Sequence, residues 1–194
     1  IHAAGDTYEI ARCASFHLVE NAAQLAATKE TAFLFGMPWI WIYAKGMGTG
    51  LLTEHAESLG KITIGGEFGY GASTDLQGVR WAHHGVLNVM RHHGLLAGRP
   101  EPLLPREYDR QRLVASTDLE TWITAPVSGI SEPLVPLGAM VKKGQPVSLI
   151  HDFERIDSGG VEIPANMDGY LLVRRFRAQT AQGDVVAVIG QETS

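Results

Sequence analysis

A strand-like stretch runs into a glycine-rich turn that holds a single carboxylate. Residues 61–64 (KITI) have a strand pattern, residues 65–71 (GGEFGYG) place four glycines around Glu67, and a long helical pattern follows. Glycine lets another group approach the backbone closely, and ligands of open α/β sheets gather at the carboxyl ends of strands. Glu67 is therefore a candidate functional group; the alternative is a solvated acid in a tight surface turn. No Gly-Lys-Ser/Thr closes the turn, so it is not a phosphate loop.

Strand and helix patterns alternate over the first half of the chain. Helix formers dominate residues 20–35 until Gly36 and Pro38 stop them, and aromatic and β-branched residues at 39–44 are typical of a strand. The alternation predicts an α/β fold. The expected elements are strands at 8–19, 39–44 and 61–64, a glycine loop at 45–50, a short helix ending at Gly60, and helices at 20–35 and 75–95.

The helix expected at 75–95 has one apolar side, and Ser73 or Thr74 is its expected N-cap. At about 100° per residue the apolar side carries Leu76, Val79, Ala82, Val86, Leu87, Val89 and Met90, and the opposite side carries Gln77, Arg80, His84, Asn88 and Arg91. We expect the apolar side to pack on a core.

A weak internal repeat follows a proline-containing stretch. Residues 123–129 (ITAPVSG) are echoed at 163–169 (IPANMDG), and residues 144–150 (GQPVSLI) are echoed at 183–189 (GDVVAVI). Duplicated short strands with glycine turns predict a small all-β barrel or sandwich. We therefore expect an α/β part at 1–98, a linker at 99–112 and a β domain at 113–194.

This second half resembles the barrel-sandwich fold of biotinyl and lipoyl carrier domains. Those domains carry a modified lysine at a hairpin tip between the two repeats, and the matching tip here, residues 157–160 (DSGG), has no lysine. A swinging-arm carrier is therefore disfavoured, and a structural or substrate-gating β domain fits better. A non-catalytic binding or adaptor module remains the alternative reading of the chain.

The overall composition excludes several classes of partner. The net charge is −5 and the sixteen Lys and Arg are scattered, so no nucleic-acid surface is indicated. No run of about 18 apolar residues is present, so no membrane span is expected. The single cysteine, Cys13, cannot form an internal disulfide and suits a reducing compartment, so we expect a cytoplasmic protein. A homo-oligomer is left open.

The eight histidines do not form an obvious metal cluster. His83 and His93 share a side of the expected helix but are about 15 Å apart along its axis, and His84 and His92 point elsewhere. His55 and His151 have no companion at ligand spacing.

One histidine motif deserves a separate hypothesis. Residues 17–20 read H-x-x-E, a spacing that places both side chains on one face of a helix and can bind zinc. However, His17 and Glu20 fall where a strand pattern changes to a helix pattern, which makes the shared face doubtful. We therefore do not favour a zinc site built from His2, His17 and Glu20.

Four segments together resemble one enzyme family, the succinylglutamate desuccinylase/aspartoacylase family. They are residues 1–5 (IHAAG), a strand ending near His17, residues 61–71, and residues 85–96 (GVLNVMRHHGLL). Members of this family are zinc-dependent amide hydrolases with a carboxypeptidase-like α/β domain and a C-terminal β domain. The resemblance covers nearly the whole chain. The branch of the family that the sequence pattern resembles includes the bacterial N-acetyl-diaminobutyrate deacetylases. It implies a zinc-dependent deacylase acting on a small N-acyl amino acid.

The resemblance also assigns individual residues. His2 matches the histidine of the family's D-[LI]-H motif, the last of three zinc ligands, and Glu67 matches the catalytic carboxylate. In the family the other two ligands belong to an H-x-x-E upstream of this histidine, and a substrate-binding arginine belongs to an upstream D-x-N-R. Neither upstream motif is present in this sequence. The resemblance thus implies that the chain is N-terminally incomplete, with the remaining Zn²⁺ ligands outside it.

The chemistry of such a site explains a carboxylate in a glycine turn. A catalytic zinc keeps an open position and lowers the pKa of its water to about 7. A nearby carboxylate takes the water's proton and later delivers it to the leaving amine. The amides of residues 69–73, beginning at Gly69, are candidates to bind a substrate carboxylate. Tyr70 and Tyr170 are candidate substrate contacts, with packing as the alternative for each. The sequence does not identify the acyl group or the amine.

Overall fold

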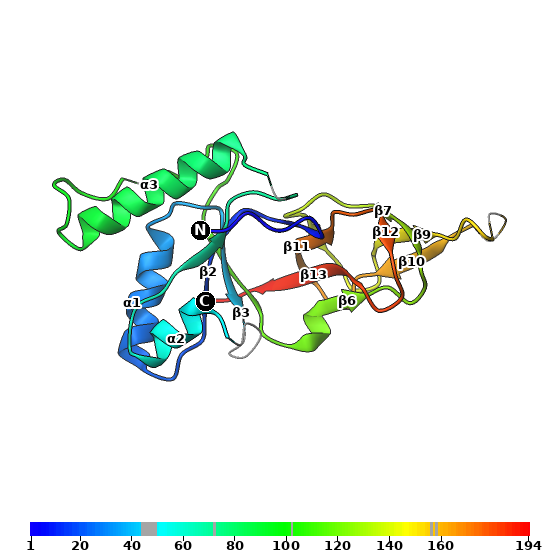
Figure 1. Ribbon diagram of the computed structural model, residues 1–194, viewed down its shortest axis with the longest axis horizontal. Coiled ribbons are helices and arrows are strands. Elements are labelled where there is room, and N and C mark those ends of the chain that lie inside the picture. The colour runs from blue at the N-terminus through cyan, green and yellow to red at the C-terminus, as the bar shows by residue number, and fades with distance from the viewer. Residues whose placement is uncertain (44–49, 72, 102, 156, 158) are drawn as a thin grey trace.

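A computed structural model describes residues 1–43, 50–71, 73–101, 103–155, 157 and 159–194. Most of the glycine loop expected at 45–50, residue 72 of the 69–73 segment and Ser158 of the hairpin tip lie outside the described residues. The molecule is elongated, with the helices at one end and most of the later strands at the other (Figure 1). The described sequence therefore folds into a mixed α/β structure.

The helices are α1 (Ala22–Phe33), α2 (Leu52–Ser58) and α3 (Leu76–His92), with a short 3₁₀ helix at Leu119–Thr121. The strands of the helix-bearing end are β2 (Cys13–His17), β3 (Trp39–Tyr43), β4 (Gly65–Glu67) and β5 (Arg112–Ser116). The remaining strands are β1 (Tyr8–Ile10), β6 (Trp122–Thr124), β7 (Gly129–Pro133), β8 (Met140–Val141), β9 (Pro146–His151), β10 (Val161–Pro164), β11 (Gly169–Arg175), β12 (Gln179–Thr180) and β13 (Val185–Glu192).

One large sheet runs through both ends of the molecule in the order β1-β11-β13-β5-β3-β2-β4. Strands β2, β3 and β5 are parallel to one another, and β4 is antiparallel to β2. Side chains alternate between the two faces of a strand, so β2 sends Ala14 and Phe16 to one face and Cys13, Ser15 and His17 to the other.

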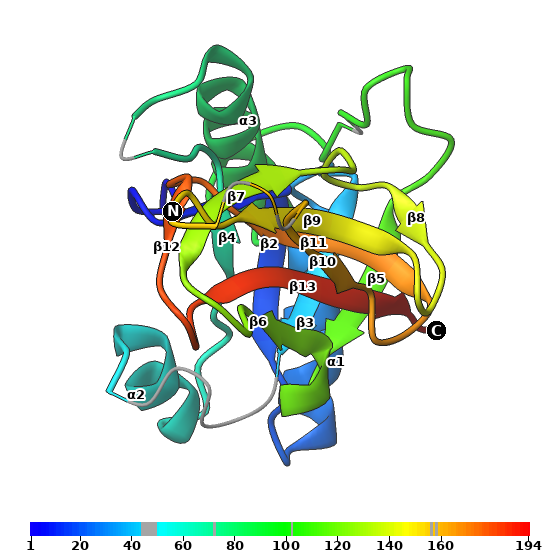
Figure 2. The ribbon, with the colours of Figure 1, turned by 90° about the vertical axis from the view of Figure 1, so that its right-hand side faces the viewer.

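The two faces of this sheet have different partners. Ala14 and Phe16 join a buried cluster with Phe35 beside α1 and Trp81 of α3. Cys13, on the other face, joins a cluster with Trp39, Trp41 and the β-strand residues Leu172 and Val188. Figure 2 shows the view along the molecule, in which β11 and β13 lie over β2 and β3. Helices α1 and α3 therefore cover the face of Ala14 and Phe16, and the sheet curls so that its strands β11 and β13 pack against the face of Cys13.

The internal repeat corresponds to a reciprocal pairing of strands. Within the first copy β7 pairs with β9, and within the second β11 pairs with β13. Between the copies β6 pairs with β13 while β10 pairs with β9, and β8 pairs with β11 while β12 pairs with β7. The two copies enclose one apolar core that includes Ile150 and Ile189, the last residues of the echoed segments.

The prediction of a strand at 61–64 is wrong, because the structure forms a strand at Gly65–Glu67 instead. Gln24 donates to the backbone oxygens of Glu57 and Lys61, and the Lys61 amide donates to Ala56. These bonds hold residue 61 against α1 and α2. The chain reaches β2 only at Gly65, so Glu67 is the last residue of a strand rather than part of a turn after it.

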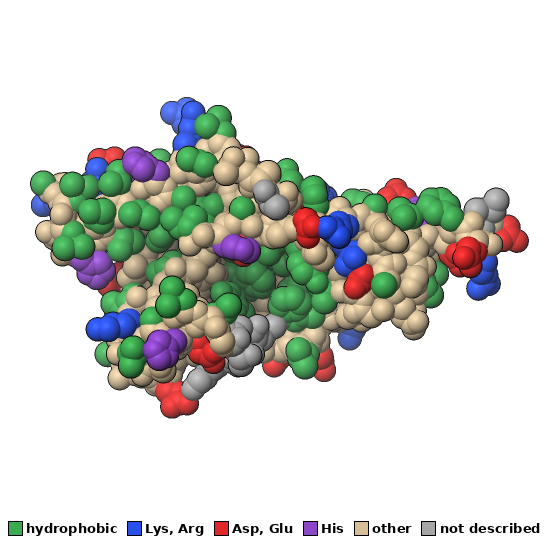
Figure 3. Space-filling view, in the orientation of Figure 1, with side chains coloured by type: hydrophobic (Ala, Val, Ile, Leu, Met, Phe, Trp, Pro, Cys, Tyr) green, Lys and Arg blue, Asp and Glu red, His purple; other side chains and the backbone are tan. Residues whose placement is uncertain are grey.

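Helix α3 packs partly as hydrophobicity predicts, because Ala82 and Val89 of the expected apolar side contact the core. Its most buried face is a neighbouring one. Its buried residues are Gly78, Trp81, Gly85 and Asn88. A Cβ at Gly85 would lie 2.1 Å from the Phe35 ring, so the two glycines admit neighbours that a larger residue would exclude. Leu76, Val79 and Val86 are exposed, in a region where Figure 3 shows hydrophobic side chains at the surface. The N-cap is Asp75, whose carboxylate accepts from the Gly78 amide.

The division into an α/β part, a linker and a β domain stays a prediction. The large sheet crosses the expected boundaries, because β5 pairs with β3 and β1 pairs with β11. None of the helices in the described ranges is long and apolar enough to cross a bilayer.

Candidate active site

Glu67 lies where an antiparallel strand pair meets the start of the chain. In the β2–β4 register Glu67 is opposite Cys13, and Gly65 is opposite Ser15. The His2 backbone continues this pairing, because its amide donates to Gly66 and its carbonyl accepts from Phe68. His2 and Glu67 are therefore direct neighbours across a parallel bridge, although they are far apart in sequence.

The side chains of His2 and Glu67 contact each other. The Nδ1 atom of His2 lies 3.1 Å from both carboxylate oxygens of Glu67. The side chain of His2 is 69% exposed, while that of Glu67 is 20% exposed. The imidazole is thus open to solvent, and the carboxylate, at the end of β4, is mostly buried.

Burial sets the electrostatics of this region. Desolvation raises the pKa of Glu67, and the hydrogen bond and charge of His2 oppose that increase. Desolvation also raises the pKa of Cys13 to about 12, and the Glu67 backbone hydrogen bond opposes it. Cys13 is therefore a buried, protonated thiol beside Glu67 rather than a nucleophile.

The structure pairs His17 with a carboxylate that lies outside the H-x-x-E motif. Nδ1 of His17 lies 3.1 Å from both carboxylate oxygens of Glu57, which belongs to α2. His84 contacts the Glu101 backbone oxygen, and the His92 ring packs edge-on against His93. Across the described ranges, no group of three or more His, Cys, Asp or Glu side chains could hold a metal ion. The described residues therefore contain no complete metal site.

The two candidate tyrosines have packing partners. The Tyr70 ring lies 5.7 Å from that of Phe176. The Tyr170 ring lies 4.8 Å from that of Trp39, and its hydroxyl accepts from Nε of Arg112 at 3.2 Å. No hydrogen bond or ring contact joins either tyrosine to Glu67 in the part of the chain that the structure describes.

The backbone segment expected to bind a carboxylate forms a turn. The Ser73 amide donates to the Tyr70 carbonyl, and Gly71 has a φ of 64° that suits glycine. The Gly69 carbonyl accepts from the Ala4 amide. Helix α3 begins three residues after Ser73, so the segment is not the first turn of that helix.

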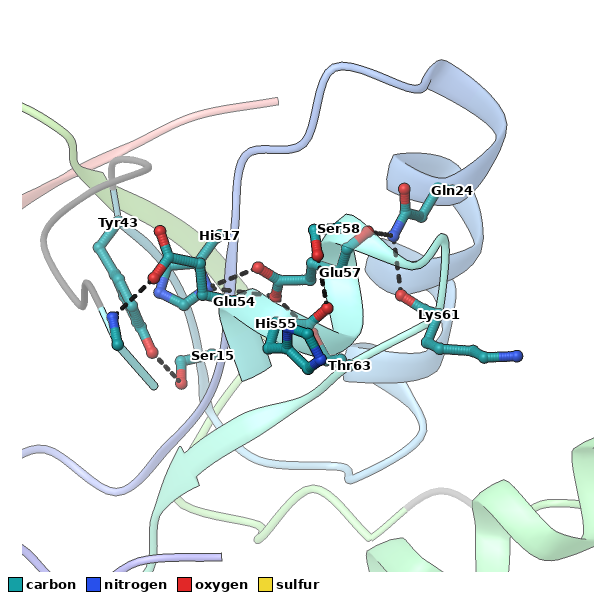
Figure 4. A network of polar contacts seen from close by, with 11 residues as sticks. Ser15, His17, Gln24, Tyr43, Glu54, His55, Glu57, Ser58, Lys61 and Thr63 are labelled. Atoms are coloured by element: carbon teal, nitrogen blue, oxygen red, sulfur yellow. Dashed lines mark hydrogen bonds and ion pairs between the residues drawn. The ribbon is translucent and has the colours of Figure 1, made fainter. Parts of the chain in front are cut away.

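Sequence reasoning missed a second polar cluster, which surrounds Glu57 (Figure 4). His17 and Thr63 both hydrogen-bond to its carboxylate, and the His17 ring packs edge-on against Tyr43 at 4.4 Å. The side chains of His17 and Glu57 are 5% and 10% exposed. A histidine at the end of a buried strand was the available signal, but its partner is forty residues away in the sequence.

Comparison with known proteins gives consistent relatives, although no family model matches the chain. The N-alpha-acetyl-L-2,4-diaminobutyric acid deacetylase of Halomonas elongata is 30% identical over 191 residues, which are 98% of this chain and 55% of that protein.

Two solved structures have the same fold over all or nearly all of this chain. A succinylglutamate desuccinylase/aspartoacylase from Rhodobacter sphaeroides has a TM-score of 0.90 at 27% identity and covers 100% of this chain and 57% of its own. The product-bound ectoine utilization protein EutE (DoeB) from Ruegeria pomeroyi has a TM-score of 0.86 at 27% identity, covering 98% and 56%.

The chain spans little more than half the length of these relatives, and it corresponds to the C-terminal part of the longer solved chains. The segments that carried the sequence resemblance include His2 and the strand of Glu67, which the fold brings into contact. The chain is therefore similar, over nearly all of its length, to the C-terminal part of members of the succinylglutamate desuccinylase/aspartoacylase family.

Proposed function

We propose that this chain is part of a zinc-dependent hydrolase that cleaves the amide bond of a small N-acylated amino acid. The observation that carries the proposal is the contact of His2 with Glu67 at the edge of the sheet. The names of the relatives support it, since one is a diaminobutyric acid deacetylase and another a desuccinylase/aspartoacylase. We expect a linear amide as substrate and the cytoplasm as location.

His2 is the proposed metal-binding residue of this chain. Its imidazole is exposed, and Nδ1 faces the carboxylate that would act on a metal-bound water. A catalytic zinc needs three protein ligands, so the other two must come from residues outside the described set. When bound, zinc supplies a water of lowered pKa and polarises the amide carbonyl.

Glu67 is the proposed proton-transfer residue. A partly buried carboxylate with a raised pKa is a better proton acceptor than an exposed one, and it can return the proton to a leaving amine. Its position at a strand end, next to Gly65 and Gly66, leaves room for a substrate beside it. Gly69, Tyr70 and Tyr170 remain weaker proposals for substrate binding, and residues 113–194 remain a proposed β domain.

The test is Glu67→Gln in the full-length protein. We expect zinc content to be retained and turnover of an N-acetyl amino acid to fall by about a hundredfold or more. Glu162→Gln, at an exposed position on β10, is the matched control and should leave turnover unchanged. Unchanged turnover in Glu67→Gln would remove Glu67 from the mechanism. If the purified full-length protein contains no zinc, that result would instead favour the non-catalytic binding module.

A further inference from the structure

A cavity of about 150 Å³ lies between helix α3, β1 and the segment that leads into β2. Its walls also include the start of β3, Tyr70, and the segments that precede β5 and β8. Tyr70 follows Glu67 by three residues, but neither His2 nor Glu67 is among the described residues that line the cavity. The proposed catalytic pair therefore does not form this space, and the proposed hydrolysis gives it no role.

Trp81 of α3 brings an unpaired hydrogen-bond donor to the wall of the cavity. The residue is 3% exposed, and its Nε1 atom is buried without a hydrogen-bond partner among the described residues. Packing against Phe35 and Phe68 in a buried cluster fixes the ring. An indole N–H can only donate, and a buried donor left without an acceptor is unfavourable. A molecule in the cavity that carries an acceptor would remove this cost.

Arg12 adds positive charge to the same wall. Its Nε atom lies 2.7 Å from Oδ2 of Asp75 but makes no hydrogen bond to it, and this Nε is also buried. The same Asp75 oxygen accepts from the Gly78 amide at the start of α3, which holds the carboxylate in place beside the guanidinium. A guanidinium has five N–H donors and no acceptor. Arg12 and Trp81 therefore both call for an acceptor in the cavity.

The rest of the wall does not oppose an anion with a small apolar part. Glu9 is the acidic residue among the described lining residues, and Nε of Arg174 donates to its carboxylate at 2.6 Å. Its charge is therefore already compensated. The remaining lining residues are mostly aromatic or apolar and include Ile10, Pro38, Trp39, Tyr108 and Leu137.

We propose that this cavity binds a short-chain carboxylate such as propionate. The carboxylate accepts from Nε1 of Trp81 and from the Arg12 guanidinium, and the alkyl part packs among the apolar residues of the wall. A primary amine is excluded, because it brings only donors and a second positive charge beside Arg12. One water needs roughly 10–15 Å³ of such space, so the cavity admits a ligand of several heavy atoms but not a large one.

The competing explanation is that ordered water fills the cavity and accepts from the same two donors. Only the ligand explanation predicts a saturable response of the Trp81 N–H to a carboxylate. Trp122 provides a matched control within the same molecule. Its Nε1 atom is also buried without a partner in the described part of the chain, but Trp122 is not among the residues that line the cavity.

The experiment follows the indole N–H resonances of the full-length protein, labelled with isotope at tryptophan, by heteronuclear NMR. Trp81→Phe and Trp122→Phe assign the two resonances. Sodium propionate, propionamide and propylammonium chloride are the probes, each at the same ionic strength. We expect propionate to shift the Trp81 resonance with a dissociation constant of about 1 mM and to leave the Trp122 resonance in place. Propionamide should bind about tenfold more weakly because it lacks the charge, and propylammonium should not bind.

Variants at Arg12 test the charge separately by calorimetric titration with propionate. Arg12→Gln should weaken binding by about tenfold or more, because a charge-assisted hydrogen bond is lost, and Arg12→Lys should retain part of the affinity. Unchanged affinity in a folded Arg12→Gln protein would place the carboxylate elsewhere, for example at the proposed metal site, and would overturn the proposal.

The NMR titration decides the proposal even if no Arg12 variant folds, since it needs only the unaltered protein. A Trp81 resonance that does not move up to about 50 mM propionate would overturn the proposal and leave water as the occupant. Equal shifts of the Trp81 and Trp122 resonances would also overturn it, because they would show a general effect of the salt. The titration requires no turnover, so its outcome does not depend on the hydrolase proposal.

Discussion

The two histidine–carboxylate pairs of this protein have the same contact distances and opposite environments. In each pair Nδ1 lies 3.1 Å from both carboxylate oxygens. The side chains are 69% and 20% exposed for His2 and Glu67, but 5% and 10% exposed for His17 and Glu57. An exposed imidazole can exchange its partner for a metal or a substrate, whereas a buried pair must satisfy its own charges. The contrast in burial therefore distinguishes a solvent-accessible pair from a pair that joins α2 to the sheet.

The largest expected effect concerns the thiol beside the exposed pair. Because burial raises the pKa of Cys13 from its ordinary value of 9.0 to about 12, the thiol stays protonated up to strongly alkaline pH. At pH 8 its thiolate fraction is lower by about 1,000-fold, and alkylation by iodoacetamide should slow by at least that factor. Peptide mass spectrometry of Cys13 in native and urea-unfolded protein measures the ratio. Rapid labelling of the native protein would show that the sheet face beside Glu67 is open rather than buried.

The next effect is on stability. His17→Ala leaves the Glu57 carboxylate buried without its main partner, and we expect the free energy of unfolding to fall by about 3 kcal/mol. The matched variant at the exposed pair, His2→Ala, should change it by less than about 0.5 kcal/mol. Urea unfolding followed by circular dichroism measures both. Equal losses in the two variants would contradict the contrast in burial.

The smallest expected effect probes the space between the pairs. A Cβ at Gly65 would lie 2.9 Å from Ser15 Oγ and 3.5 Å from the Tyr43 hydroxyl. Gly65→Ala, two residues before Glu67, should therefore lower kcat/KM for an N-acetyl amino acid by about tenfold, an effect of about 1.4 kcal/mol. Its free energy of unfolding should change by less than about 1 kcal/mol, because the Ser15 hydroxyl can rotate away. Steady-state kinetics with an N-acetyl amino acid would show whether the substrate uses this space, and full activity would place the substrate elsewhere.

Local patterns predicted the parts of the fold that depend on local chemistry. Helix α1 lies within the expected range 20–35, and β3 within 39–44, because helix formers and β-branched aromatics determine them directly. The most buried face of α3 was mispredicted because close packing of Phe35 on Gly85 outweighs the apolar stripe. The strand at Gly65 was mispredicted because Gln24 holds residue 61 elsewhere.

The candidate site likewise contains residues that the sequence indicated and residues that it did not. Glu67 stood out because a lone acid among glycines is unusual, and the family resemblance added His2. The Glu57 cluster could not be found from the sequence, because the contact of Glu57 with His17 depends on how α2 packs against β2. Contacts across forty residues follow from tertiary packing, which no local pattern encodes.

The most direct test of the account is the zinc content of His2→Ala compared with Glu67→Gln, both in the full-length protein. Elemental analysis after gentle purification should give about one zinc per chain in Glu67→Gln and under about 0.2 in His2→Ala. That result would assign metal binding to the exposed imidazole and proton transfer to the carboxylate beside it. About one zinc per chain in His2→Ala would contradict the assignment and with it the proposed hydrolytic site.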